Sequence, residues 1–438
     1  MYWFILLFPL LIFPWGYDAY YTSPKTAYLD IFVLGMWLYI VLKRKYWTIN
    51  LKKLHLNGEF FIILFMLLVV VSTVFSVNVK TSINGTEKRY EGLLTFFSYC
   101  SIFLFSYRLL DSTKLRKVIP GMAFISVIVS IYGILQHYLL DFLPRNSSKL
   151  MDVRSSGFFD NPNFFGSYLV LVMLLTITLY LTEKNIKLSS FYYLTSGLAF
   201  AALLFTGTRS GWVGVFIGMV LVTLLVVFQR KHLWKKWTLL LVTLGMIIAV
   251  INASENGNYV NRANTVVKDT VQLASKQSTG HEGSNRFFIW KKALPLVKNY
   301  FWTGSGPDTL EFVFPATPEE LTAYFSNPNA IVDKAHNEYL HMAVTLGVPA
   351  LLVYLSLLLL VLGRAYQASR TVRGNEKIFL LGLIATILGY LAQAFFNISV
   401  VPVAPLFWAI LGITLAKSEL ALKNQKGQTL QKEIVQSA

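Results

Sequence analysis

The chain has 438 residues, of which 55% are hydrophobic and 14% are charged, and its mean hydropathy is +0.54. This composition excludes a soluble globular enzyme and favours a protein that crosses a membrane many times. The net charge of +17 does not indicate a nucleic-acid-binding protein, because the basic residues lie in short connections between apolar runs. The single cysteine, Cys100, excludes an intrachain disulfide and a cysteine-based metal cluster.

The apolar runs predict an all-α polytopic membrane protein with about twelve transmembrane helices. The first run has no basic segment before it and no small-residue cleavage site, so we expect a retained span and not a signal peptide. The seventh and eighth runs are joined by little more than Thr208 and Arg209, which predicts a tight hairpin or a pair of short spans. The expected spans are 2–17, 26–42, 58–76, 92–110, 119–140, 163–182, 190–207, 210–228, 237–253, 337–363, 377–396 and 401–417.

Lysine and arginine are unevenly distributed over the connections between these spans. In the short connections, most of them follow the second, fourth, sixth, eighth and tenth spans. Positive residues concentrate on the cytoplasmic side of membrane proteins, so these connections and both termini are predicted to be cytoplasmic. The chain then divides into spans one to nine (1–253), an extracytoplasmic loop (254–336), spans ten to twelve (337–417) and a cytoplasmic tail (418–438) that is a short helix or disordered.

The long polar loop contains local helix signals. Residues 285–299 place apolar side chains at helical spacing with lysines between them, which predicts a helix on the membrane surface. The run Thr317-Pro318-Glu319-Glu320 predicts a helix start, with threonine as the N-cap and proline at the first helical position. A short helix is also expected from Asn264 to Lys276, and another helix start near Asp333.

Two arginines near this loop are candidates for anion binding. Arg209 lies between two apolar runs, where a permanent charge is costly without a partner, and its guanidinium can bind a phosphate or carboxylate through paired hydrogen bonds. The alternative is a side chain that only reaches the outer interface. Arg286 is an ordinary solvated charge unless the turn containing Gly304 and Gly306, whose backbone amides can contact an anion, lies beside it.

His336 is predicted to open the tenth span at the outer surface. A neutral imidazole there can take a proton from an attacking hydroxyl, whereas the alternative is a histidine that only caps the helix. Glu338 and His341 follow closely, but two histidines five residues apart do not share a helix face and are not a zinc signature. No carboxylate lies near the middle of a span, which argues against an ion-coupled carrier.

Four stretches, taken in order, resemble the O-antigen ligase and polymerase family of bacterial envelope glycosyltransferases. The expected topology, with one large outer loop between the ninth and tenth spans, is similar as well. The four stretches are SGFFDNPNFFGSYL (156–169), LLFTGTRSGWVG (203–214), NRFFIWKKAL…NYFWTGSGPDTLE (285–311) and AHNEYLHMAVTLGVPALL (335–352).

The resemblance implies a membrane-embedded, metal-independent and inverting glycosyltransferase that needs no cofactor, in the cytoplasmic (inner) membrane of a bacterium. The donor would be a glycan on undecaprenyl diphosphate, and the acceptor a glycan, a lipid or a cell-wall polymer. His336 would be the general base, and Arg209 and Arg286 would hold the donor diphosphate. The residues implied to support the site are Gly304, Gly306, Asn337, Glu338, Asn161 and Asn163.

Polymerase, ligase and protein O-glycosyltransferase all remain open among the activities that this resemblance implies. The alternative from another class is a flippase or transporter of lipid-linked oligosaccharides, in which the same arginines would bind a diphosphate without catalysis.

Overall fold

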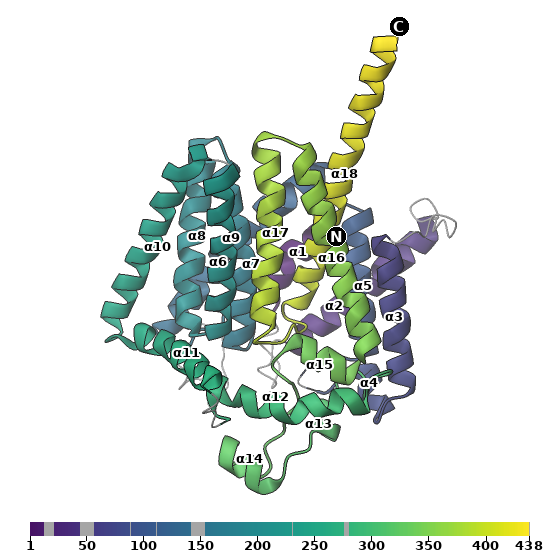
Figure 1. Ribbon diagram of the computed structural model, residues 1–438, viewed down its shortest axis with the longest axis vertical. Coiled ribbons are helices and arrows are strands. Elements are labelled where there is room, and N and C mark those ends of the chain that lie inside the picture. The colour runs from purple at the N-terminus through teal and green to yellow at the C-terminus, as the bar shows by residue number, and fades with distance from the viewer. Residues whose placement is uncertain are drawn as a thin grey trace.

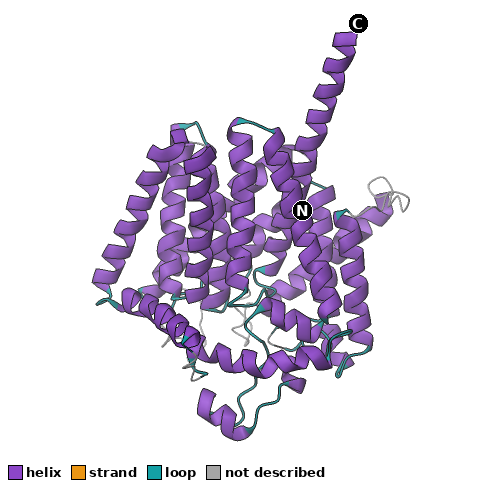
Figure 2. Ribbon diagram, viewed as in Figure 1, coloured by secondary structure: helices purple, strands orange, loops and turns teal. Residues whose placement is uncertain are grey.

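The computed structural model describes residues 1–12, 22–43, 57–87, 89–110, 112–141, 154–229, 231–275 and 280–437. Its described residues form helices and connecting loops, without a strand (Figure 2). Among these residues, nine helices are long and apolar enough to cross a membrane. The expected all-α polytopic membrane architecture is therefore confirmed.

Most of the helices that meet this length and composition run roughly parallel in one bundle, whereas α2 crosses it obliquely (Figure 1). Two further apolar helices, α3 (Gly58–Val74) and α5 (Leu93–Arg108), are shorter but belong to the same bundle. The nine longer helices are α2 (Thr22–Lys43), α6 (Ser112–His137), α7 (Pro162–Thr182), α8 (Ile186–Thr206), α9 (Arg209–Gln229), α10 (Trp234–Ser254), α16 (Val348–Thr371), α17 (Gly374–Ala394) and α18 (Ala404–Ser437).

Helix α7 lies at the centre of the bundle, and every side chain from Phe164 to Leu181 is buried. It contacts α8, α9 and α17 along its length. Small residues allow these helices to approach closely: a Cβ atom added at Gly214 of α9 would lie 2.7 Å from the carbonyl oxygen of Gly389 in α17. This packing holds the ends of α7, α8 and α9 in fixed positions.

The hairpin predicted between the seventh and eighth spans is present, and both of its helices are full-length. Helix α8 ends at Thr206 and α9 begins at Arg209. Gly207 closes α8 with a φ of 59°, in the left-handed region that glycine adopts without a steric penalty. The turn therefore places Arg209 at the first position of α9, at one end of the bundle.

That end of the bundle, opposite the free end of α18, is covered by shorter helices, and we call it the loop face (Figure 1). The helix expected at 285–299 is present, and the helix start at Thr317, which forms a capping box with Glu320, is confirmed. The expected short helix from Asn264 begins earlier than predicted, at Asn258. The helices of the loop face are α4 (Val79–Asn84), α11 (Asn258–Ala274), α12 (Glu282–Asn299), α13 (Leu310–Val313), α14 (Pro318–Phe325) and α15 (Glu338–Thr345).

The prediction of one continuous tenth span at 337–363 is wrong. The segment is divided into α15, on the loop face, and α16, in the bundle. Gly347 separates them with a φ of 87°, and Pro349 occupies the first turn of α16, where a missing N–H is tolerated. The helix start expected near Asp333 is wrong too, because α15 begins only at Glu338, after the N-cap Asn337.

The first expected span, 2–17, is not confirmed as a regular helix. Helix α1 (Tyr2–Leu7) is followed by a 3-10 turn, η1 (Phe8–Leu10), and residues 13–17 lie outside the described ranges. At the other end of the chain, α18 continues to Ser437 (Figure 1). The tail expected at 418–438 thus extends the last span as one helix over its described residues.

Candidate functional site

Arg209 and Arg286 line the same pocket on the loop face, although they are far apart in sequence. The pocket has a volume of about 110 Å³ and lies where the start of α9, the middle of α11 and the start of α12 meet. Its lining residues are Arg209, Ser210, Val213, Val266, Asp269, Glu282, Gly283, Arg286, Phe287, Trp290 and Phe396.

Arg209 is held by side chains of α11 and α12. Its Nη1 donates to Asp269 Oδ2 and to Thr265 Oγ1, each at 2.9 Å, and its Nη2 donates to Ser284 Oγ at 2.7 Å. Asp269 Oδ2 also accepts a hydrogen bond from the backbone N–H of Gly283 at 3.0 Å. A carboxylate therefore lies where a guanidinium and a backbone amide converge, which is an arrangement suited to an anion.

Arg286 follows a left-handed turn formed by Gly283, Ser284 and Asn285, whose φ angles are 64°, 61° and 66°. No ion pair or hydrogen bond to its guanidinium occurs within the described residues. Burial, and then the positive charges of Arg209 and Arg154, lower the pKa of Arg286 to about 10. An unpaired, partly buried guanidinium is costly, so the pocket carries positive charge that an anionic ligand would compensate.

Two further arginines contact the turn that precedes Arg209. Arg154 Nε donates to the carbonyl oxygen of Thr206, and Arg262 Nε donates to that of Gly207, both at 2.8 Å. Neither Arg154 nor Arg262 was singled out from the sequence. No local motif marks them, because they meet at the turn only through the packing of α6 to α11.

His336 lies directly before α15 and is partly buried, with a φ of 49°. The next residue, Asn337, caps the helix through its side chain, which accepts from the N–H of Leu340 at 3.0 Å. Trp290 of α12 donates its indole N–H to the carbonyl oxygen of Ala335 at 2.9 Å. His336 therefore precedes the cap, and an anchored segment fixes its backbone beside α12.

Arg286 lies one helical turn before Trp290, so both side chains share the face of α12 that meets the His336 segment. Burial, and then the positive charge of Arg286, lower the pKa of His336 to about 4. The imidazole is consequently neutral at neutral pH, which is the state that can accept a proton. The structure thus places His336 within electrostatic reach of one of the two predicted anion-binding arginines.

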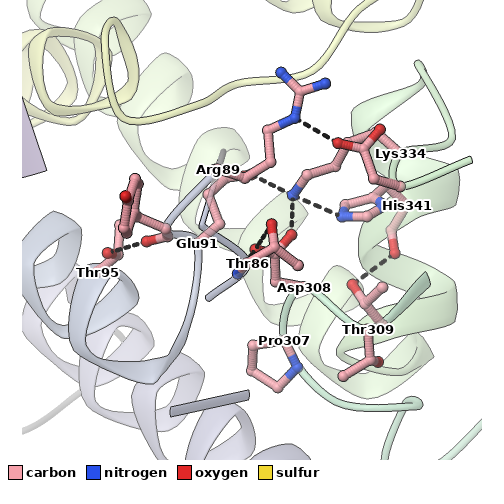
Figure 3. Close-up of polar contacts among 12 residues, drawn as sticks. Thr86, Arg89, Glu91, Thr95, Pro307, Asp308, Thr309, Lys334 and His341 are labelled. Carbon is pink, nitrogen blue, oxygen red and sulfur yellow. Dashed lines mark hydrogen bonds and ion pairs between the residues drawn. The ribbon is translucent and has the colours of Figure 1, made fainter. Parts of the chain in front are cut away.

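A buried ionic cluster fixes the other side of the His336 segment (Figure 3). Lys334 Nζ lies 2.5 Å from Glu91 Oε2 and 2.8 Å from Asp308 Oδ1, and Asp308 Oδ2 accepts from the backbone N–H and hydroxyl of Thr86 at 2.7 and 2.9 Å. Burial alone would lower the pKa of the Lys334 ammonium, but the two carboxylates hold it well above its usual value. The cluster ties three distant segments together.

A second ion pair lies beside this cluster. Arg89 Nε contacts Asp333 Oδ2 at 2.6 Å, and the guanidinium lies 5.7 Å from the ring centroid of Phe164, at the start of α7. Both Asp333 and Arg89 act electrostatically on His336. Residues 333–336 are thus attached to the α4–α5 connection on one side and to α12 on the other.

The turn at 304–306 has a different role from the one predicted. Its three amides are already occupied: those of Gly304, Ser305 and Gly306 donate to the carbonyl oxygens of Tyr300, Val344 and Thr345 at 3.0, 2.9 and 2.9 Å. A Cβ atom at Gly304 would lie 2.2 Å from the Thr345 oxygen. The expectation that these amides contact an anion is therefore wrong, and the glycines instead allow the turn to pass close to α15.

The other predicted supporting residues join elements and do not line the arginine pocket. Asn161 caps α7 by accepting from the N–H of Asn163 at 2.8 Å, and the carbonyl oxygen of Asn163 accepts from Asn397 Nδ2 at 3.3 Å. Glu338 accepts from the Tyr354 hydroxyl at 2.9 Å. These contacts position α7 and α15, and through them the α8–α9 turn and His336.

Comparison with models of known protein families finds one family that part of this chain resembles. Residues 194–355 match the family model described as O-antigen ligase, a segment that contains Arg209, Arg286 and His336 but neither Arg89 nor Glu91. A search of curated proteins finds no match. Residues 194–355 of the chain are therefore similar to an O-antigen ligase domain, and this match supports the assignment to the O-antigen ligase and polymerase family that the motifs indicate.

Proposed function

We propose that the protein transfers a glycan from an undecaprenyl-diphosphate-linked donor to an acceptor glycan, lipid or polymer, with inversion and without a metal. The reaction would take place on the outer face of a bacterial cytoplasmic membrane, where the predicted topology puts the loop face. The family match supports glycan transfer in general. The observation that carries the finer proposal is the pocket that Arg209 and Arg286 line, with the neutral imidazole of His336 within electrostatic reach of Arg286.

The arginine pocket suits the leaving group of this reaction. When the bond between the anomeric carbon and the diphosphate oxygen breaks, negative charge develops on the diphosphate, and fixed guanidinium groups stabilise it. Arg286 has no anionic partner within the described residues, and Arg209 is paired with the single carboxylate of Asp269. A diphosphate would supply the charge that Arg286 lacks and would compete with Asp269 for Arg209.

His336 is placed to act on the acceptor. Its neutral imidazole takes the proton of the acceptor hydroxyl as the oxygen attacks the anomeric carbon from the side opposite the diphosphate. One C–O bond forms, one C–O bond breaks, and the proton later leaves the imidazolium to water. Inversion of the anomeric centre follows from this single displacement.

Donor binding would also prepare the base. The charge of Arg286 contributes to the low pKa of His336, and a diphosphate bound to that arginine would neutralise this effect. The pKa of His336 would then rise, while burial, the larger cause, continues to lower it. The base would therefore become stronger only when the donor is in place.

The test uses purified protein in lipid nanodiscs with the undecaprenyl-diphosphate-linked oligosaccharide of the host. Release of undecaprenyl diphosphate and the size of the glycan product are followed by mass spectrometry. A ladder of products indicates a polymerase, and a single transfer to an added acceptor indicates a ligase. Movement of the intact lipid across the bilayer without release would instead indicate the flippase alternative.

One variant and one chelator experiment sharpen this test. Arg209→Lys keeps the charge but loses the paired hydrogen bonds of a guanidinium, so transfer is expected to fall strongly. A near-normal rate would mean that Arg209 only reaches the interface and binds no donor. A metal chelator is expected to leave transfer unchanged, and loss of transfer on chelation would overturn the metal-independent mechanism.

A further inference from the structure

A second, larger cleft opens on the loop face, on the side of the His336 segment away from the arginine pocket. Figure 1 shows α4 and α11 at opposite sides of this face, with α12 and α15 between them. The cleft has a volume of about 700 Å³, within the size range of small-molecule binding sites. Its lining residues are Asn78, Lys80, Thr81, Asn84, Gly85, Thr86, Glu87, Arg89, Tyr90, Glu311, Ile331 and Asp333.

The chemistry of this lining differs from that of the arginine pocket. Amides, hydroxyls and charged groups of both signs line it, so it presents hydrogen-bond donors and acceptors without a concentration of positive charge. Such a lining suits sugar hydroxyls, each of which both donates and accepts, and it does not suit a diphosphate. Tyr90, held at a φ of 56°, adds an aromatic ring of the kind that packs against the apolar face of a sugar.

The cleft is joined to His336 through one ion pair. Arg89 and Asp333 line the cleft, pair with each other at 2.6 Å, and both act electrostatically on His336. Arg286, which lines the other pocket, is the strongest charged neighbour of the same imidazole. The imidazole of His336 is therefore within electrostatic reach of residues that line the arginine pocket and of residues that line the cleft.

A displacement reaction needs the base to lie between the site of the leaving group and the site of the acceptor. The attacking hydroxyl approaches the anomeric carbon opposite the leaving diphosphate, so the acceptor must extend away from the diphosphate pocket, with its hydroxyl at the base. We infer that the cleft between α4 and residues 331–333 is the subsite that binds the acceptor, and that this acceptor is a glycan. The inference rests on the proposed transfer reaction and adds to it the place and the chemical class of the second substrate.

The test compares two neighbouring positions of α4. Asn84 lines the cleft, whereas Ile83, which is 36% exposed, does not. Asn84→Trp would place a large ring in the cleft, and Ile83→Trp adds the same side chain outside it. The acceptor probe is the oligosaccharide released by mild acid from the host's lipid-linked glycan, and the labelled lipid-linked glycan is the donor.

We expect Asn84→Trp to raise the KM for the released oligosaccharide at least about tenfold, which corresponds to the loss of two or three hydrogen bonds. The KM for the donor should stay unchanged, and Ile83→Trp should resemble the wild type in both. Saturation-transfer NMR should show the oligosaccharide bound to the wild type and to Ile83→Trp but not to Asn84→Trp.

The outcomes separate the two proposals. An unchanged acceptor KM in Asn84→Trp, or a raised donor KM instead, would overturn the acceptor subsite while leaving the transfer reaction intact. If the wild type transfers no glycan to any acceptor and releases no undecaprenyl diphosphate, the proposed function itself fails. Binding of the oligosaccharide to Asn84→Trp as well as to the wild type would also contradict the inference.

Discussion

Replacing Lys334 by methionine tests whether the buried ionic cluster holds the His336 segment in place. The Lys334 side chain is 0% exposed, and the carboxylates of Glu91 and Asp308 on either side of it are 6% and 0% exposed. Lys334→Met keeps the volume of the side chain but leaves two buried carboxylates without their cation. Breaking a buried pair in this way costs about 3–5 kcal/mol.

This free energy should appear as local opening of the loop face. Because 1.36 kcal/mol is a tenfold change in an equilibrium, opening should become roughly 10²- to 10⁴-fold more frequent. The amides of Ser305 and Leu340, which bond to the Val344 carbonyl and the Asn337 side chain, report on it directly. Their hydrogen exchange in lipid nanodiscs should accelerate by this factor, whereas amides of α7 should not change.

Two controls complete this experiment. Lys292→Met breaks an ion pair with Glu320 whose side chains are 28% and 33% exposed, so it should cost only about 0–1 kcal/mol. Adding Glu91→Gln and Asp308→Asn to Lys334→Met removes the stranded charges and should restore most of the protection. If Lys334→Met exchanges no faster than Lys292→Met, the cluster does not hold the segment and this reasoning is refuted.

Three other predictions concern the site and its orientation. Since the pKa of His336 is about 4 in the free protein, kcat/KM should fall tenfold per pH unit only below about pH 4. The acid limb of the kcat profile should lie at higher pH, because the bound donor neutralises Arg286. A kcat/KM limb near pH 6.5 would contradict this prediction. Asp269→Asn should strengthen inhibition by inorganic pyrophosphate by several-fold to about tenfold, because it removes the carboxylate that competes with pyrophosphate for Arg209. Weaker inhibition would mean that Asp269 instead positions Arg209. A thiol introduced by Glu319→Cys, on the exposed surface of α14, should react with an impermeant maleimide added outside cells. The buried Cys100 should not react. Labelling that occurs only after cell lysis would reverse the predicted topology.

The sequence predicted the membrane-spanning helices well, because long apolar runs leave few alternatives to a helix. It failed where one residue interrupts such a run. The apolar segment after Asn337 reads as one span, but Gly347 in a left-handed conformation ends α15 and lets α16 begin at a different angle. Periodicity does not carry this information, because glycine is common inside transmembrane helices.

The candidate site was predicted in part. Arg209 was singled out because it lies between two apolar runs, whereas Arg286 and His336 were singled out because each stands next to a helix expected in or after the outer loop. The residues that hold them were not identified, because each pairs with a distant segment. Lys334 and Glu91, for example, are 243 residues apart. Pairings over such separations depend on how α5 and α15 pack, which local patterns do not report.

The turn at Gly304 and Gly306 illustrates a different limit. A glycine-rich turn fits both an anion-binding loop and a close approach between backbones. Only the hydrogen bonds of its amides to the end of α15 distinguish the two. Sequence composition therefore located the turn correctly but could not assign its role.

The most direct test of the central claim is the rate of glycan transfer by His336→Ala beside His232→Ala. His232 is exposed in the 3-10 turn η3 (Lys231–Leu233), remote in sequence from both pockets, so the two variants remove the same side chain from different surroundings. The account predicts that His336→Ala retains its fold and still binds the lipid-linked donor but loses nearly all transfer, while His232→Ala transfers at the wild-type rate. Wild-type transfer by His336→Ala would contradict the assignment of His336 as the base.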